Sequence, residues 1–439
     1  MSATTTLASR IINAKKYINT HFDETFDDNH IYFYNGRLQP WEDEYSPKLS
    51  TSAESEIVDH RLQRIFMKKM GLDDVMLGIR RFNWILNTIY TRADYNVEYT
   101  DYRNWLHPEQ PFYVMNSEEN VYKCISNGNG TQSLIEPTGT SFEYLYLGDG
   151  YIWKFMFNLK DAITDKFLTD TWIPVPVRDE DKSVDHLFIE ANTIEGDIVY
   201  IHVDDAGKDY TYAPEIHIRG DGSNTLATSI IEGEKITHIQ VNNRGEGYNF
   251  ANVEIFGNGT EAKATAMIAP PGGHGSDAIH ELGAFYVVTS AELIGDEDGV
   301  LPIIGTYRNV GLVENTKDSN DDIIISESIN TLSDINISNT SGKFMTNELV
   351  IGEDSLAEAR IYFDPFDGTT IHMFRIWGEF IDGENIHGQE TGEVCVYEDA
   401  GSTYTDVDIL SGDIIYKENI IFITRREIQI EKFVFVVEF

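Results

Sequence analysis

Cysteine is scarce in this sequence. The 439 residues include two cysteines, Cys124 and Cys395, which lie far apart and form no CxxC motif. Disulfide scaffolds and zinc knuckles both depend on closely spaced cysteines, so neither class fits this chain. The usage is typical of a protein made in a reducing cytosol.

Basic residues are also few. The chain has 33 Lys and Arg residues against 73 Asp and Glu residues, which gives a formal net charge of −40. Such a charge repels nucleic-acid phosphates and anionic lipid headgroups. We therefore expect no nucleic-acid partner. No apolar run approaches the roughly 20 residues that span a bilayer, and residues 1–10 lack the features of a signal peptide, so we expect no membrane insertion.

Sequence motifs that identify common classes of enzymes and phosphate-binding sites are also missing. The sequence contains no HExxH, no GxSxG and no GxxxxGK[ST], which are the signatures of zincins, of the hydrolase nucleophile elbow and of the phosphate loop. Carboxylates are so numerous that a glycosidase pair cannot be singled out. We assign no catalytic residue, no cofactor-binding residue and no metal ligand, and expect a protein that is not an enzyme and carries no cofactor.

What the sequence does contain is an internal repeat. Residues 203–213 return as residues 241–251 at an offset of 38, and residues 216–222 return as residues 253–259 at an offset of 37. Alternating β-branched residues surround Gly-Asp-Gly and Gly-Asn-Gly, a pattern that predicts short antiparallel strands joined by tight turns. Repeats of this kind usually stack into a β-module that displays a surface.

A second repeat lies nearer the C-terminus. Residues 342–352 recur as residues 378–388 at an offset of 36, and an alternating run follows each copy. The two repeats show no likeness to each other in sequence. We interpret them as two unrelated β-modules inserted into a host fold.

The remaining sequence predicts a few helices and several aromatic strands. Apolar spacing indicates one helix from Leu7 to Ile18 and another over residues 57–70. The run from Tyr151 to Phe157 predicts a strand that is buried on both faces, with the Gly148-Asp149-Gly150 turn before it. The C-terminal residues 433–439 are apolar on both faces and end without a polar tail. A terminus of this kind is expected inside a sheet or beneath another subunit.

A group of basic residues stands out in the acidic chain near the second expected helix. A solvated helix face is the simpler interpretation, and a docking patch for an acidic neighbour is the alternative. The residues are Arg61, Arg64, Lys68, Lys69, Arg80 and Arg81.

Some turn and aromatic residues allow a binding interpretation. Asp221 and Asn258 in the repeat turns weakly resemble calcium-binding β-roll positions, and Asp298 weakly resembles an EF-hand position, but neither ligand set is complete. Ordinary turn residues explain all three more simply. The aromatic pairs of the first repeat could stack on sugars, although packing in the core of the repeat is the simpler interpretation. These pairs are Tyr210 with Tyr212 and Tyr248 with Phe250.

Several segments together resemble one known family. The stretch from Leu147 to Phe157, LGDGYIWKFMF, with Glu136-Pro-Thr-Gly-Thr before it, closely resembles the central signature of the baseplate wedge subunit called gene product eight in T-even-like contractile-tailed bacteriophages. Residues 29–41, 121–124 and 411–419 and the Phe-rich end agree with that family in the same order. Together the segments cover about half of the chain, and their shared order is more specific than any single motif.

The resemblance implies a structural, non-enzymatic subunit that forms a homodimer and contacts other wedge proteins. It implies a mainly β fold, multi-domain and sandwich-like or barrel-like, with a few N-terminal α-helices. Both repeats look like insertions relative to the shorter family type. The expected division is host fold in residues 1–185, 280–321 and 409–439, with inserted β-modules in residues 186–279 and 322–408. The expected location is the virion tail baseplate, after assembly in the cytoplasm of the host cell.

Two other classes of function remain open at the level of sequence. One is a calcium-binding or glycan-binding adhesin in which the inserted modules read a receptor. The other is an enzyme of polysaccharide degradation, which would need a deep cleft with two carboxyl groups at a suitable separation.

Overall fold

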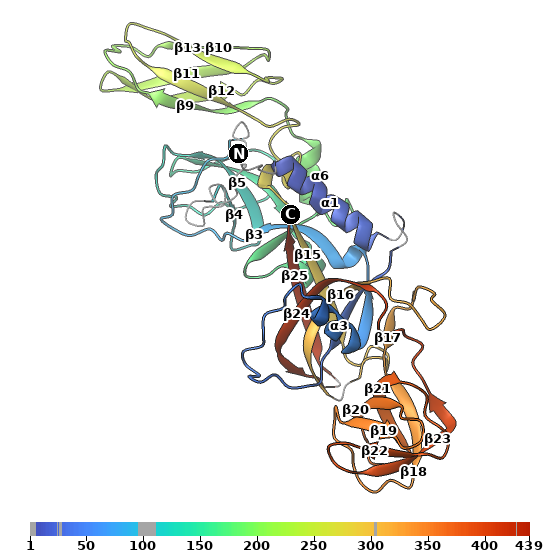
Figure 1. The fold of residues 1–439 in the computed structure, drawn as a ribbon. Coiled ribbons are helices and arrows are strands. Elements are labelled where there is room, and N and C mark those ends of the chain that lie inside the picture. The colour runs from blue at the N-terminus through green and yellow to red at the C-terminus, as the bar shows by residue number, and fades with distance from the viewer. Residues whose placement is uncertain (1–5, 24, 26–28, 95–110, 303–304, 427) are drawn as a thin grey trace. The chain divides into compact units, whose positions relative to one another are not determined.

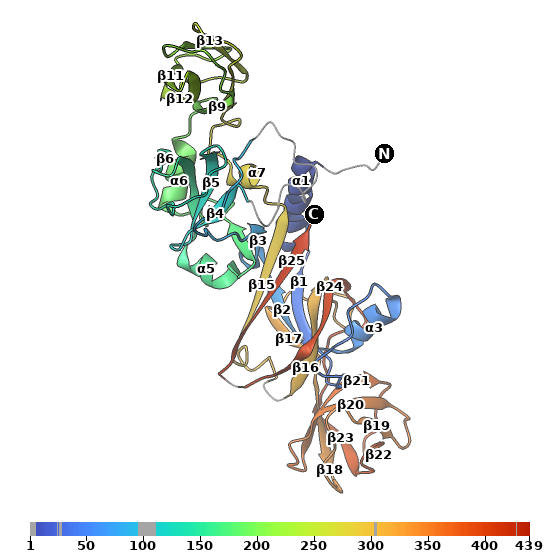
Figure 2. The same cartoon turned by 90° about the vertical axis from the view of Figure 1, so that its left-hand side faces the viewer.

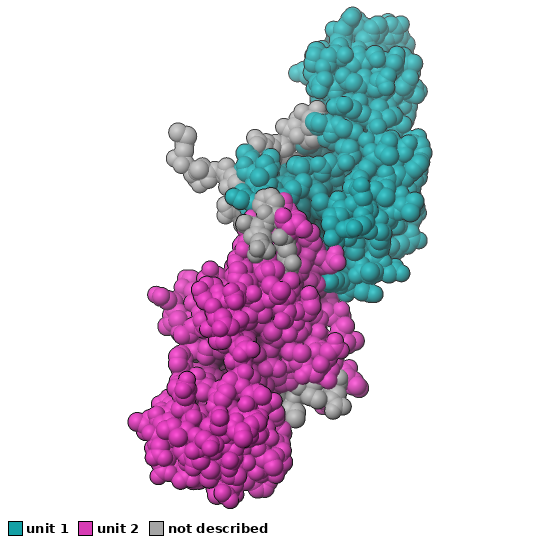
Figure 3. All heavy atoms as spheres, turned by 90° about the vertical axis from the view of Figure 1, so that its right-hand side faces the viewer, with its two compact units in different colours: residues 1–16, 76–289, 435–439 teal, residues 17–75, 290–434 magenta. Residues whose placement is uncertain are grey.

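The computed structural model describes residues 6–23, 25, 29–94, 111–302, 305–426 and 428–439. The fold is mainly β, with several sheets and a few short helices, as the sequence predicts (Figure 1). Two compact units divide the chain (Figure 3). Unit 1 contains residues 1–16, 76–289 and 435–439, and unit 2 contains residues 17–75 and 290–434. Each unit therefore draws on segments that are far apart in the sequence.

Unit 2 is built around a five-stranded antiparallel sheet. The sheet has the order β17-β2-β1-β16-β24. All six residues of its central strand β1 are buried, because both faces of the strand are covered. The strands are β17 (Ser328–Asn330), β2 (Arg64–Met70), β1 (Ile31–Gly36), β16 (Thr306–Glu314) and β24 (Asp413–Thr424), and helix α3 (Glu54–Leu62) lies near β24.

The helix expected over residues 57–70 is wrong in its second half. Helix α3 ends at Leu62, and the next residues form strand β2, which pairs with β1 from Ile31↔Met70 to Gly36↔Arg64. The residues from Arg64 to Met67 are all buried. The sequence pattern of a short apolar run that is buried on both faces fits a strand and a helix equally well. Here the pairing with a distant strand determines that the run is a strand.

Unit 1 contains an aromatic four-stranded sheet of order β4-β5-β7-β6. Seven of the eight residues of β7 are buried, and Trp153 is 0% exposed, which confirms the predicted two-sided burial. The strands are β4 (Tyr113–Met115), β5 (Asn120–Asn127), β7 (Tyr151–Asn158) and β6 (Leu145–Tyr146), and the helices α5 (Asp161–Phe167) and α6 (Val184–Ala191) follow them.

A second four-stranded sheet has the order β25-β15-β3-β8. The C-terminal strand β25 is half-buried here, with Phe435 4% exposed and Phe433 stacked on Phe33 at 4.9 Å between ring centroids. The N-terminal helix begins at Leu7, as predicted, and continues past the expected end at Ile18 to Phe22. The elements are β25 (Ile430–Glu438), β15 (Tyr286–Ile294), β3 (Val75–Arg80), β8 (Trp172–Val175), α1 (Leu7–Phe22) and the 3-10 helix η1 (Leu72–Asp74).

The first repeat forms a six-stranded module in unit 1, of order β13-β10-β11-β12-β9-β14, and β13 also contacts β14. Strands β9 and β12 pair at Ile201↔Ile239, two residues that are 38 apart and so occupy the same place in the two repeats. The two copies are therefore related by an approximate two-fold axis. The strands are β9 (Ile198–Asp205), β10 (Glu215–Gly220), β11 (Leu226–Glu232), β12 (Lys235–Asn243), β13 (Ala251–Phe256) and β14 (Lys263–Ile268).

The second repeat forms a closed barrel in unit 2, of order β18-β21-β20-β19-β22-β23 (Figure 2). Strands β19 and β22 pair at Ile351↔His387, which are 36 apart, so this module also has an approximate two-fold axis. Its interior is filled by a cluster of buried apolar residues. The strands are β18 (Ser333–Ser338), β19 (Leu349–Gly352), β20 (Glu358–Phe363), β21 (Thr370–Trp377), β22 (Asn385–Gly388) and β23 (Val394–Thr403).

The two modules share one topology, although their repeats show no likeness to each other in sequence. Each repeat supplies three successive strands. In both modules the two first strands pair with each other, and the two second strands pair with each other. The third strand of each repeat lies beside the first strand of the other repeat. Both modules are therefore duplicated β-units with the same strand order.

Candidate functional site

Five buried ionisable residues lie together in unit 1, where the first module meets the aromatic sheet. We call them the buried charge cluster. They come from β5, β7, the residue directly before β9, the loop after β14, and helix α7 (Ala278–Leu282). They are Lys123, Lys154, Asp197, His274 and Glu281, and each side chain is less than one tenth exposed. Charged groups this deeply buried require partners.

Glu281 and Lys123 form the ion pair at the centre of the cluster. The Lys123 ammonium donates to Glu281 Oε2, while Glu281 Oε1 accepts from the backbone N–H groups of Gly275 at 2.8 Å and Asp277 at 3.1 Å. Burial alone would raise the pKa of Glu281, but the Lys123 charge and the hydrogen bonds outweigh it and hold the pKa at about 2. The carboxylate thus fixes the loop before α7 to strand β5.

Asp197 forms the second contact of the cluster, directly before β9. The Tyr144 hydroxyl donates to Asp197 Oδ2 at 2.9 Å, and the Arg244 guanidinium lies 3.9 Å from the same oxygen and over the Tyr144 ring at 4.9 Å. Burial raises the pKa of Asp197 to about 6, against the lowering effect of Tyr144 and the nearby cations. Arg244 also pairs with Glu143 at 3.1 Å, so one side chain of the module contacts two residues of the loop before β6.

Lys154 and His274 complete the cluster. Lys154 Nζ donates to the Phe142 carbonyl, and burial lowers the pKa of Lys154 to about 8. Burial and the Lys123 charge lower the pKa of His274 to about 4, so its imidazole is neutral at neutral pH. His274 Nδ1 has no hydrogen-bond partner in the described part of the chain and lies 3.8 Å from Glu281 Oε2.

Apolar packing surrounds these charges. Ile125, Tyr144 and Ile152 of the aromatic sheet region form one cluster with Val199, Tyr200 and Met267 of the module. The Tyr200 hydroxyl also donates to Asn129 Oδ1 at 2.8 Å. The module is therefore attached to the aromatic sheet by both apolar and charged contacts. We call this contact region the joint.

A cavity of about 420 Å³ adjoins the joint. Lys123, His274 and Glu281 contribute to its polar wall, while its apolar wall includes Phe112, Ile125, Met267 and Pro270. It also borders Ala93 and Asp94, and the residues that follow them, 95–110, lie outside the described part of the chain. The Glu281 carboxylate already accepts three donors, so it acts as a structural contact.

The structure brings none of the calcium candidates into a ligand set. Asp221 accepts from the backbone N–H groups of Asn249 and Phe250, and Asn258 Oδ1 accepts from the Thr211 N–H. Asp298 has a positive φ of 58° in a turn. All three act as turn residues. Among the described residues there is no group of three or more His, Cys, Asp or Glu side chains that could hold a metal ion.

The aromatic pairs of the first repeat separate into core and surface. Tyr210 and Tyr248 are 4% and 5% exposed, and their rings fill the space above Gly259 and Gly222 of the other repeat, as core packing predicts. Tyr212 and Phe250 are instead 57% and 62% exposed, so the core interpretation is wrong for them. In a regular strand, residues two apart point to the same face of the sheet. These four residues lie in turns between strands, so that rule does not apply to them.

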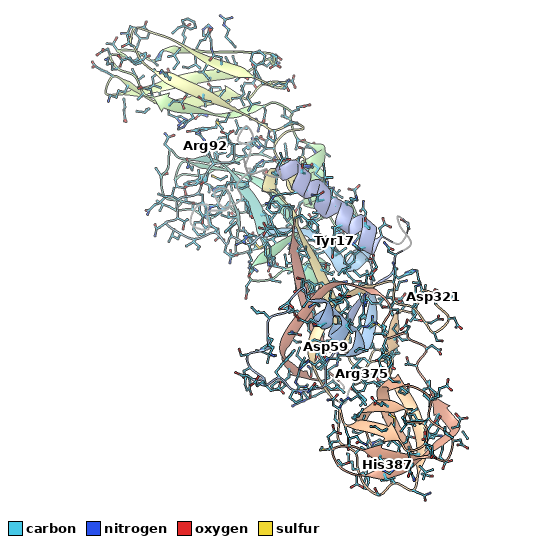
Figure 4. All side chains as sticks on the ribbon, in the orientation of Figure 1. Tyr17, Asp59, Arg92, Asp321, Arg375 and His387 are labelled. Atoms are coloured by element: carbon cyan, nitrogen blue, oxygen red, sulfur yellow. The ribbon has the colours of Figure 1, made fainter. Side chains whose placement is uncertain are left out.

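The basic residues do not share a helix face, because most of them lie on β2 and β3. Arg64 is 1% exposed and donates to the carbonyls of Ile409 at 2.9 Å and Ser411 at 3.0 Å. Lys68 donates to the Glu292 carbonyl at 2.8 Å. These two cations hold connections within unit 2. Nearby, Figure 4 labels Asp59 of α3 and Arg375 of β21, whose charges interact.

Two buried glutamates of the barrel were not foreseen from the sequence. Glu348 accepts from the N–H groups of Met345 and Thr391, and Glu384 accepts from those of Ile381 and Ser355. The two residues are 36 apart and are related by the approximate two-fold axis. Each carboxylate holds a turn of its own repeat to a turn of the other. The signal for both was an acidic residue at the same place in each repeat.

Sequence reasoning also missed the buried charge cluster. Its available signal was a lysine inside an apolar strand, as in Tyr122-Lys123-Cys124 and Trp153-Lys154-Phe155.

No helix within the described ranges is long and apolar enough to cross a membrane. No protein-family model matches the chain, and no curated protein matches it.

Proposed function

We propose that this chain is a structural subunit of the tail baseplate wedge of a contractile-tailed bacteriophage. The observation that carries the proposal is the place of the segments that resemble the wedge family. They supply the central strand β1, strand β5, the buried strand β7 and part of β24, so the resemblance falls on the framework of both units. The repeats supply separate modules with their own cores.

The chemistry of the buried groups supports a mechanical role. Glu281, Glu348 and Glu384 all use their carboxylates to accept backbone N–H groups, and Arg64 uses its guanidinium to hold carbonyls. Buried hydrogen-bonded charges of this kind specify one arrangement of neighbouring segments. A subunit that holds wedge neighbours before contraction, and rearranges with them when the tail contracts, requires such joints. We assign no catalytic residue and no cofactor.

The proposed partners are a second copy of the chain and other wedge proteins, assembled in the infected cytoplasm and carried in the virion. We place the contact between copies on the host fold at β25, whose first residue, Ile430, is 63% exposed. Ile430→Glu should then yield monomers in sedimentation velocity experiments. Leu226→Glu, at a position of the first module that is also 63% exposed, is the matched control and should leave the dimer intact. A wild-type chain that is monomeric at micromolar concentration would overturn this contact.

The proposal as a whole is tested by a cryo-electron microscopy reconstruction of an intact particle that contains the chain. The expected result places the chain in the baseplate, in contact with other wedge subunits. Density for the chain in the capsid, or its absence from purified particles, would refute the proposed role.

A further inference from the structure

The first module exposes two aromatic side chains at equivalent places of its two repeats. Tyr212 and Phe250 are 38 apart and are 57% and 62% exposed. Most side chains that the repeats share have a structural role: Tyr210 and Tyr248 fill the core, and Thr228 and Thr265 donate cross-strand hydrogen bonds to Asn242 and Asp204. Neither Tyr212 nor Phe250 has a side-chain hydrogen bond or a ring contact in the described part of the chain.

Both exposed rings sit on turns that the other repeat holds in place. Asp221 Oδ1 accepts from the N–H groups of Asn249 at 2.9 Å and Phe250 at 3.1 Å. On the equivalent turn, Asn258 Oδ1 accepts from the Thr211 N–H at 3.3 Å, and its amide donates to Thr211 Oγ1 at 2.6 Å. A ring presented on a fixed turn loses little conformational freedom on binding, which favours affinity.

The barrel provides an internal comparison. At the same place in its topology, on the turn before the second strand of each repeat, it exposes Met345 and Ile381, each 52%. The same duplicated unit therefore presents aliphatic side chains in one module and aromatic side chains in the other. A partner that needs only apolar contact would bind aliphatic and aromatic side chains equally well. The aromatic side chains of the first module therefore indicate a ligand that interacts with ring faces.

We propose that Tyr212 and Phe250 form two equivalent platforms on which a neutral glycan stacks the apolar faces of its sugar rings. The C–H groups of a pyranose face carry partial positive charge, which an aromatic face attracts. The flanking Asn and Thr side chains suit sugar hydroxyls at the rim of such a contact. Residues 198–268 contain ten acidic and five basic residues, so the module repels anionic glycans. Two related platforms fit a polysaccharide with a repeating unit, because binding at both adds avidity.

The test is affinity electrophoresis of the full-length chain in native gels that contain galactomannan, β-glucan or dextran, with anionic alginate as the charge control. At least one neutral polysaccharide should retard the wild-type chain, and alginate should not. The double variant Tyr212→Ala/Phe250→Ala should lose about tenfold or more in apparent affinity. Its melting temperature should stay unchanged, because both rings are exposed.

Three further variants separate glycan stacking from protein docking and from general effects. Met345→Ala/Ile381→Ala changes the equivalent positions of the barrel and should bind as the wild type does. Tyr212→Trp/Phe250→Trp should retain binding, whereas Tyr212→Leu/Phe250→Leu, which keeps apolar area without a π face, should lose it. No retardation of the wild type by any of the three neutral polysaccharides overturns the proposal, and so does unchanged binding of the Ala or Leu variant. The proposal goes beyond the baseplate role, and each can fail without the other.

Discussion

Removing the positive charge of Lys123 should open the joint between the first module and the aromatic sheet. Lys123→Met keeps an unbranched apolar stem but leaves Glu281 buried with two backbone donors and without its ion-pair partner. Removing one partner of a buried ion pair costs about 3–5 kcal/mol, because the remaining charge is uncompensated. An exposed pair, Lys208 with Glu261 at 2.9 Å, should cost less than about 1 kcal/mol when Lys208 becomes Met.

The double variant Lys123→Met/Glu281→Gln separates the effect of the charges on stability from the effect of the hydrogen bonds. A glutamine oxygen can still accept the Gly275 and Asp277 N–H groups, while no charge stays buried. Replacing both members of a buried ion pair is often nearly neutral, so we expect the double variant to lie within about 1 kcal/mol of the wild type. The double variant should then be more stable than Lys123→Met by about 2–4 kcal/mol.

Hydrogen exchange measured by mass spectrometry is the suitable assay, because it reports the local opening free energy of each segment. Peptides from β5, β7 and α7 should exchange faster in Lys123→Met and recover in the double variant. Peptides from the barrel, residues 333–403, should not change and serve as the internal control. If Lys123→Met costs less than about 1 kcal/mol, or if the double variant is as unstable as the single one, the ion pair does not hold the joint.

Four other substitutions test the structure at three separate points. Trp153→Ala should cost about 3–5 kcal/mol and yield insoluble protein, since the side chain is 0% exposed; a stable, soluble variant would contradict the burial of β7. Glu348→Ala and Glu384→Ala should each destabilise the barrel by about 3 kcal/mol in thermal unfolding. Unequal effects would contradict the approximate two-fold symmetry. The pKa of His274 is lowered to about 4 by burial and the Lys123 charge, so the neutral imidazole stabilises the fold. That contribution, up to about 3 kcal/mol, is complete above pH about 6.5 and is lost as the pH falls toward 4. His274→Gln should flatten the stability profile between these pH values, and an unchanged profile would refute the assignment.

The local sequence pattern was sufficient to predict a helix or a strand where the apolar spacing agrees with the burial in the structure. The helix that begins at Leu7 and the strand from Tyr151 to Phe157 were predicted correctly, because their apolar spacing matches one element type. The segment from Arg64 to Met70 was misread as helical because only its pairing with β1 distinguishes the alternatives. The buried charge cluster could not be assembled from sequence, since Lys123 and Glu281 are 158 residues apart and meet only in the folded chain.

The sequence by itself determined that this protein is acidic, mainly β and twice duplicated, because composition and repeats are properties of the chain alone. Tertiary structure decided that the two duplications share one strand order, since order depends on which distant strands pair. It also decided which member of each aromatic pair is exposed: Tyr210 and Tyr248 fill the space above a glycine of the opposite repeat, while Tyr212 and Phe250 remain in solvent. Exposure is a property of the packed module, and no local pattern of residues specifies it.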